Sequence, residues 1–167
     1  MSQKELVLIR HAKSDWSDGS LKDFDRPLNA RGRRVAPKMG KKLFENEELP
    51  ELILTSPAAR ALSTTEYISE QLPIDASKIV HTPDIYEASV RTLLSIINTI
   101  DDQYNRVFMV GHNPGFSYLA EYLSGEEIRN VPTCGVVKIN LTVDSWQEVS
   151  QNLGTLNYFI YPKQFDF

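Results

Sequence analysis

The run Glu-Leu-Val-Leu-Ile at residues 5–9 is followed at once by Arg10 and His11. The four consecutive apolar residues, Leu6–Ile9, predict a buried strand close to the N-terminus. Two further runs have the same character, Leu52–Thr55 (LILT) and Arg106–Gly111 (RVFMVG). Strands that are apolar on both faces are typical of parallel sheets that helices cover on both sides. These three runs are therefore predicted to form the centre of such a sheet.

The segments between these strands carry helix signals. Asn29 is a candidate N-cap for a helix with apolar residues at every fourth position, and Pro37 inside it predicts a kink or a later start. Ser56 and Pro57 form a start signal for a helix that reaches about residue 72. The remaining predicted elements are a short strand at 79–81, helices at 89–100 and after the turn at 113–115, and strands at 136–141 and 155–161.

Strands that alternate with helices and end in a strand pair predict an α/β fold. The mostly parallel central sheet would have helices on both faces. The chain has 167 residues, of which 41% are hydrophobic and 24% charged, which is typical of one globular domain. No repeat or linker divides it. We therefore expect one domain over residues 1–167, without a large cap insertion.

Charge and composition exclude several classes of protein. The formal net charge of −4 argues against a protein that binds duplex nucleic acid. No apolar run approaches the length of a membrane span, and the first residues lack the apolar core of a secretory signal. The single cysteine, Cys134, has no internal partner and reads as a buried small apolar residue. A cytoplasmic protein is therefore expected.

Charged and titratable side chains follow each of the three buried strands. Arg10 and His11 end the first strand, Arg60 lies one helical turn after the second, and His112 follows the third. Ligands of open α/β sheets bind at the carboxyl ends of the strands. Each of these residues alone is explained by a solvated charge or a structural histidine. Together, guanidinium groups, histidines and two helix N-termini favour a phosphate as the ligand.

Four segments in order then resemble the histidine phosphatase superfamily, and are most similar to its small phosphohistidine phosphatase, SixA-like branch. The first contains Arg-His-Ala, a variant of the Arg-His-Gly signature. The second is the entry to the first helix, the third carries the second arginine, and the fourth carries the second histidine. Their order and spacing agree over residues 5–125, and the resemblance implies a phosphoglycerate mutase-like fold. The segments are residues 8–16, 25–32, 55–65 and 110–113.

The resemblance implies a role for each matching residue. His11 would be the nucleophile, and Arg10, Arg60 and His112 would hold the phosphoryl oxygens. Ser17 stands where larger relatives have a phosphate-binding asparagine, and its hydroxyl is a shorter donor. The two guanidinium groups would also disfavour protonation of His11 and keep it nucleophilic.

Two features depart from the family pattern or lie outside its core. Ala12 replaces the usual glycine, so the backbone there must avoid positive φ. An ester substrate needs a proton donor for its leaving group, and Glu87 is the best candidate, with Asp15 as the alternative. First-turn complementarity to a helix dipole would equally explain Glu87.

The expected function is a phosphatase that works through a phosphohistidine intermediate and needs no metal or other cofactor. The short stretch between Arg60 and His112 predicts an open site, which favours phosphohistidine of a protein as substrate. The expected partner is therefore a phosphorylated protein or a small phosphorylated metabolite, with no nucleic acid and no membrane.

Three other functions remain open on the sequence. One is a phosphatase or mutase acting on a small phosphate ester. Another is a non-catalytic module that recognises phosphate. A third is a metal-dependent phosphoesterase that would use His11, His112, Asp15 and Glu87, although no His-x-His or His-Glu-x-x-His spacing supports it.

Overall fold

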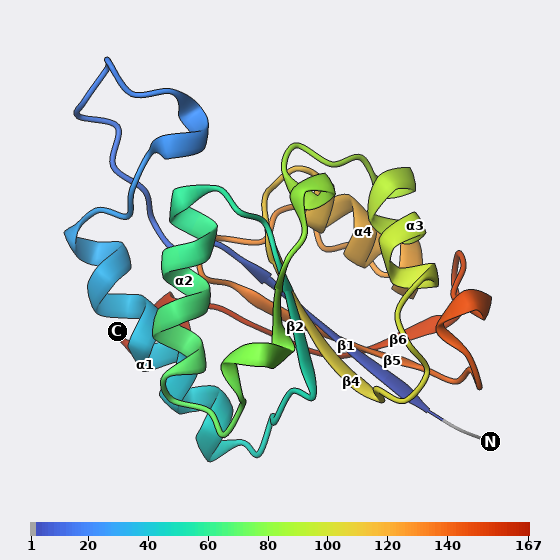
Figure 1. The fold of residues 1–167 in the computed structure, drawn as a ribbon. Helices are drawn as coiled ribbons and strands as arrows, with labels where there is room; N and C mark the ends of the chain where they lie inside the picture. Colours follow the sequence, from blue (N-terminus) through green and yellow to red (C-terminus); the bar gives the residue numbers. More distant parts are fainter. Residues whose placement is uncertain (1–2) are drawn as a thin grey trace.

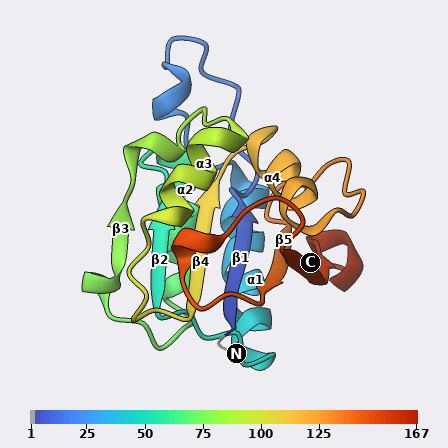
Figure 2. The same cartoon turned by 90° about the vertical axis from the view of Figure 1, so that its right-hand side faces the viewer.

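Six strands form one sheet in the computed structural model, which describes residues 3–167. The strand order is β3-β2-β4-β1-β5-β6 (Figures 1 and 2). The first four strands of this order are parallel, and β5 and β6 are antiparallel to their neighbours. The strands are β1 (Lys4–Arg10), β2 (Leu52–Thr55), β3 (Ile79–His81), β4 (Arg106–Gly111), β5 (Val136–Leu141) and β6 (Gly154–Ile160). The predicted α/β fold and mostly parallel sheet are confirmed.

Helices cover both faces of the sheet, as predicted. Figure 1 shows α1 and α2 on one side of the sheet, and α3 and α4 on the other. Alternate residues of β1 serve the two cores, because Leu6 and Leu8 pack beneath α3 and α4 while Val7 and Ile9 pack beneath α1 and α2. The helices are α1 (Ala30–Glu45), α2 (Ala59–Ser69), α3 (Val90–Asn98) and α4 (Gly115–Ser124). Short 3₁₀ helices are η1 (Asp23–Asp25), η2 (Ala76–Lys78), η3 (Pro83–Ile85), η4 (Trp146–Glu148) and η5 (Pro162–Phe165).

Helix α1 begins where the Asn29 cap predicts it, whereas helix α2 begins later than predicted. Helix α1 begins at Ala30 directly after the Asn29 cap and continues past Pro37, so the later start is wrong. Helix α2 begins only at Ala59, and the side chain of its N-cap residue, Ala58, makes no capping hydrogen bond. The hydroxyl of Ser56 accepts a hydrogen bond from the amide of Ala58 at 3.2 Å, but it lies before the helix rather than at its cap. The helix also ends at Ser69, before residue 72.

The sheet topology brings three strand ends together. Because β4 lies between β2 and β1, its last residues pair with the ends of both neighbours: Arg10 with Gly111, and Thr55 with Val110. The segment between β1 and α1, which contains η1, projects beyond this edge of the sheet (Figures 1 and 2). Within the described part of the chain, no helix is long and apolar enough to span a membrane.

Candidate active site

A pocket of about 280 Å³ opens at the carboxyl ends of β1, β2 and β4. It brings together the four residues that the sequence placed at these ends, Arg10, His11, Arg60 and His112. Both histidines and Arg60 are buried, and the ring centroids of the two histidines are 5.2 Å apart. The rest of the lining is Lys13, Ser14, Trp16, Arg26, Asn113 and Thr133.

The His11 ring is held in one orientation. Its Nδ1 lies 2.7 Å from the carbonyl oxygen of Ala12, and because a carbonyl only accepts, Nδ1 carries the proton. The neutral ring then keeps a free lone pair on Nε2. The Ala12 amide donates to Thr64 Oγ1 at 2.9 Å, and that hydroxyl donates to the Arg60 carbonyl at 2.8 Å. As expected, the backbone of Ala12 has no positive φ.

Burial keeps both histidines uncharged. It is the main cause that lowers the pKa of His11 to about 3, with further lowering by the charges of His112, Arg60 and Arg10. The pKa of His112 falls to about 4, again mainly through burial and then through Arg60. Both imidazoles are therefore neutral near pH 7.

The buried donors around His11 are only partly satisfied. Arg10 donates from Nη1 to the carbonyl of Val131 at 3.0 Å, and His112 Nε2 lies 2.8 Å from Ser56 Oγ. Arg10 Nε, Arg60 Nε and His112 Nδ1 have no partner, and they are three of the five unpartnered buried side-chain atoms in residues 3–167. Unpaired buried polar groups are rare in folded proteins. Their gathering here suits a polar ligand that accepts hydrogen bonds.

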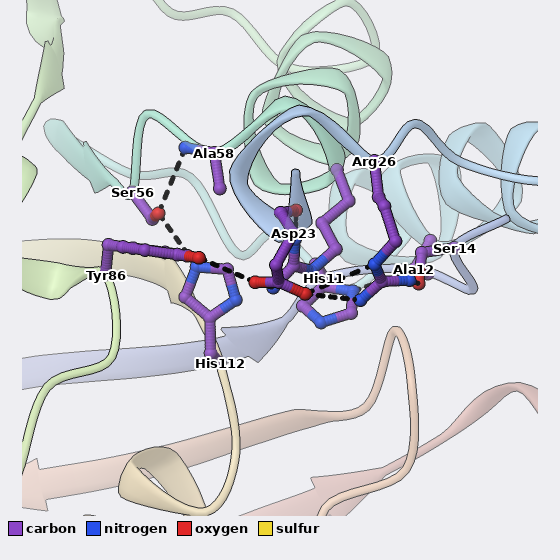
Figure 3. A network of polar contacts seen from close by, with 10 residues as sticks. His11, Ala12, Ser14, Asp23, Arg26, Ser56, Ala58, Tyr86 and His112 are labelled. Carbon is purple, nitrogen blue, oxygen red and sulfur yellow. Dashed lines mark hydrogen bonds and ion pairs between the residues drawn. The ribbon is translucent and has the colours of Figure 1, made fainter. Parts of the chain in front are cut away.

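Asp23 is a site residue that the sequence reasoning missed. Its carboxylate lies between two guanidinium groups, accepting from Arg60 Nη2 at 2.9 Å and from Arg26 Nη2 at 2.9 Å (Figure 3). Tyr86 donates its hydroxyl to the same carboxylate at 2.6 Å. The hydrogen bond from Tyr86, followed by those from Arg26 and Arg60, holds the pKa of Asp23 well below its usual range. An anion thus already lies against part of the cationic lining.

Arg26 and Trp16 also belong to this site. Arg26 Nη1 donates to Ser14 Oγ at 2.8 Å, and its guanidinium lies 3.4 Å from the centre of the Trp16 ring. The Trp16 side chain is at the pocket and is 75% exposed. Arg26 lies in a segment that matches the family pattern, but it follows no strand. Only the course of the loop after β1 brings it, together with Asp23, to the strand ends.

The other candidates lie outside the pocket lining. Ser17 is exposed, and its backbone amide donates to Asp15 Oδ1 at 2.7 Å. The structure therefore does not bring Ser17 or Asp15 to the four central residues. Glu87 is exposed and lies beside Tyr86, whose ring is 5.4 Å from that of His112. Burial, then Asp23, then Glu87 raise the pKa of Tyr86 to about 12.

Cys134 is buried, as expected, and burial raises the pKa of its thiol to about 12. Among the described residues, no group of three or more histidine, cysteine, aspartate or glutamate side chains is arranged to hold a metal ion.

A pocket lined by two arginines and two histidines at the carboxyl edge of an α/β sheet is typical of sites that bind phosphate-type anions. Comparison with known proteins identifies the family of this chain. Residues 6–93 match the model of the histidine phosphatase superfamily (branch 1). An Arabidopsis thaliana protein, named as uncharacterized and chloroplastic, is 32% identical over 155 residues, covering 87% of this chain and 70% of its own.

Solved structures agree in fold. The putative phosphohistidine phosphatase SixA from Agrobacterium tumefaciens is 30% identical, with a TM-score of 0.81 over 95% of this chain and 98% of its own. The putative SixA from Nakamurella multipartitia is 21% identical, with a TM-score of 0.85 over 97% of this chain and 98% of its own. The chain therefore belongs to the histidine phosphatase superfamily and to its SixA-like branch. This membership supports a phosphatase.

Proposed function

We propose that the protein is a metal-independent phosphatase that forms a phosphohistidine on His11 and acts on phosphohistidine of a protein. The observation that carries this proposal is the set of unpartnered buried donors around the free Nε2 of His11. Guanidinium and imidazole donors suit the oxygens of a phosphoryl group. A nucleophile with a free lone pair in their midst suits transfer of that group.

The first step is attack of His11 Nε2 on phosphorus, in line with the leaving group. The new N–P bond forms as the bond to the leaving group breaks, and the electron pair of that bond goes to the leaving atom. The His11 ring becomes positive in this step. The hydrogen bond from Nδ1 to the Ala12 carbonyl stabilises that charge. In the second step water attacks phosphorus and the N–P bond breaks, with its electron pair returning to His11 Nε2. The protons of the water leave with inorganic phosphate, and His11 returns to its neutral form.

Arg10, Arg60 and His112 would bind the equatorial oxygens and stabilise their charge in the transition state. We assign the His112 proton to Nδ1. Ser56 accepts from the Ala58 amide and donates its own hydroxyl proton to His112 Nε2, which leaves Nδ1 to donate to substrate.

The proton that a leaving group needs is the basis for the proposed substrate class. Asp23 is the carboxylate held at the site, and its lowered pKa keeps it ionised, so it has no proton to give. Glu87 and Asp15 lie outside the pocket lining. An alkoxide leaving group needs a proton donor, whereas the imidazole of a phosphohistidine that is protonated on its other ring nitrogen leaves as a neutral ring. The site therefore favours a phosphoramidate over an alkyl ester.

Access to the pocket supports a protein substrate. Between Arg60 and His112 the chain forms the remainder of α2, then β3, α3, β4 and short 3₁₀ turns, and adds no domain over the pocket. Trp16 at the rim is largely exposed. A phosphohistidine side chain that projects from another protein would reach a pocket of this size without enclosure of the whole substrate.

The proposal is tested by rapid-quench turnover on a phosphohistidine protein, a set of sugar phosphates and p-nitrophenyl phosphate. We expect the highest kcat/KM on the phosphohistidine protein and an acid-labile phosphate on His11 by mass spectrometry. The His11→Ala variant should lose both turnover and the label. Preference for one small phosphate ester, or a label on another residue, would contradict the proposal.

A further inference from the structure

A second pocket, of about 270 Å³, adjoins the active-site pocket and carries no assigned role. The two pockets share Lys13 and Thr133 in their linings. The second pocket also contains Arg31 and Lys163. We call it the basic side pocket. Because Lys13 and Thr133 line both spaces, the basic side pocket begins where the active-site pocket ends.

Three segments far apart in the sequence supply the three cations. Lys13 follows β1, Arg31 is in the first turn of α1, and Lys163 is in η5. The loop and the helix are joined by a hydrogen bond from the Asn29 amide to the Lys13 carbonyl, 2.9 Å long. The remaining wall is largely apolar and includes Val35.

The cations of this pocket have no internal counter-charge. Within residues 3–167, no hydrogen bond or ion pair engages the side chains of Lys13, Arg31 or Lys163. Neither pocket has an aspartate or glutamate in its lining. The chain as a whole has 22 acidic against 18 basic residues, so unpaired cations with no acid beside them run against its composition.

The position of Arg31 is unfavourable for the helix that carries it. Helix α1 has no acidic residue in its first turn, where the helix dipole favours negative charge, and Arg31 adds a positive one. Local choices that conflict with stability are expected where a function requires them. A bound anion would be stabilised by the helix N-terminus and by Arg31 together.

We propose that the basic side pocket is a specificity subsite that binds the carboxylate of an acidic side chain next to the phosphohistidine of the substrate protein. This inference rests on the proposed function. A carboxylate on a short aliphatic stem fits a pocket whose lining combines cations with apolar groups such as Val35. A second phosphate on a small molecule shares the anionic chemistry, and the experiment separates the two sources.

The experiment compares two phosphohistidine peptides that differ only by glutamate or glutamine beside the phosphohistidine. We expect the wild-type protein to hydrolyse the glutamate peptide with about three- to tenfold higher kcat/KM, the range that two or three exposed ion pairs provide. The Arg31→Gln/Lys163→Gln double variant should lose this preference. Its kcat/KM on the glutamine peptide and on p-nitrophenyl phosphate should equal that of wild type.

The matched control is Arg34→Gln/Lys41→Gln, which removes two exposed cations of α1 outside both pockets. It should keep the preference for glutamate. If both double variants lose the preference equally, long-range charge explains it and the subsite is overturned. The subsite is also overturned if wild type shows no preference, or if the Arg31→Gln/Lys163→Gln variant slows all substrates alike.

A further arm separates failure of the proposed function from failure of the subsite. If neither peptide is hydrolysed, the proposed function fails, and inhibition of p-nitrophenyl phosphate hydrolysis then tests the pocket alone. The alternative result is that a small bisphosphate inhibits more strongly than the monophosphate only when Arg31 and Lys163 are present. That result would overturn the acidic side chain as the ligand of the subsite and assign a second phosphate group instead. Equal inhibition in wild type and variant would overturn the subsite altogether.

Discussion

Asp23 and the phosphoryl oxygens of a substrate would compete for the guanidinium group of Arg60. Its two terminal nitrogens donate to Asp23, while Nε has no partner. If Arg60 stabilises the phosphoryl oxygens, Arg60→Ala should lower kcat/KM by about 10²–10³, the scale of one lost charge-stabilising donor. Arg60→Lys should recover only part of this, because an ammonium group lacks the guanidinium fork. Steady-state kinetics on p-nitrophenyl phosphate measure both, and full activity in Arg60→Ala would contradict the role.

Asp23 places a negative charge where a negatively charged substrate would bind. Asp23→Asn should therefore tighten competitive inhibition by inorganic phosphate several-fold, since a carboxylate–phosphate repulsion is removed. The control is Asp25→Asn in the same 3₁₀ turn, whose residue does not contact the arginines and should leave inhibition unchanged. Weaker inhibition in Asp23→Asn would instead mean that Asp23 mainly holds Arg60 in position.

The sequence predicted those site residues whose position depends on strand ends alone. Arg10, His11 and His112 follow buried strands directly, so the topology of a parallel sheet is enough to bring them together. Asp23 reaches the site through an irregular loop, and no periodicity describes such a path. The same loop carries Ser17 away from the pocket, although the family pattern placed it there.

The start of α1 supports the loop that follows β1. Asn29 accepts a hydrogen bond from the Gly32 amide at 2.8 Å, and its own amide donates to Lys13. Asn29→Ala should lower the free energy of unfolding by about 1 kcal/mol, the usual cost of a lost N-cap. Thermal unfolding should show a fall of about 2–4 °C. Asn29→Asp keeps the capping acceptor and should show little change; an equal loss in both variants would mean that the cap does not account for it.

Element positions were predictable where one signal dominates. The apolar runs gave the central strands, and the Asn29 cap gave the start of α1. The predicted start of α2 was wrong because the Ser56 hydroxyl can either cap a helix or contact a distant side chain. A serine before Pro57 reads as a helix cap, but in the structure its hydroxyl lies 2.8 Å from His112 Nε2 and the helix begins at Ala59. A local signal cannot show that a distant histidine contacts the same hydroxyl.

The order of the strands in the sheet determines which residues meet in the candidate active site. Pairing of β4 with both β1 and β2 places His112 between the segments that carry His11 and Arg60. Alternation of strands and helices predicts a parallel sheet, but not which strands are neighbours. The net charge of −4 likewise says nothing of a cationic pocket, because charge is a sum and the pocket is a local arrangement.

The two buried histidines also make the stability of the whole molecule depend on pH. Their folded pKa values, about 3 for His11 and about 4 for His112, lie below the value of about 6.5 expected in the unfolded chain. Between these values the unfolded chain binds protons that the folded protein does not, so stability falls as the pH falls. From pH 7.5 to 5 the loss should be on the order of 1–2 kcal/mol per histidine. Urea unfolding at each pH measures this loss of stability.

The variant His112→Asn should reduce this pH dependence. The variant His81→Asn, at an exposed position in β3, serves as the control for loss of a histidine from the surface. The same pH dependence in wild type and His112→Asn would show that burial does not hold His112 in its neutral form.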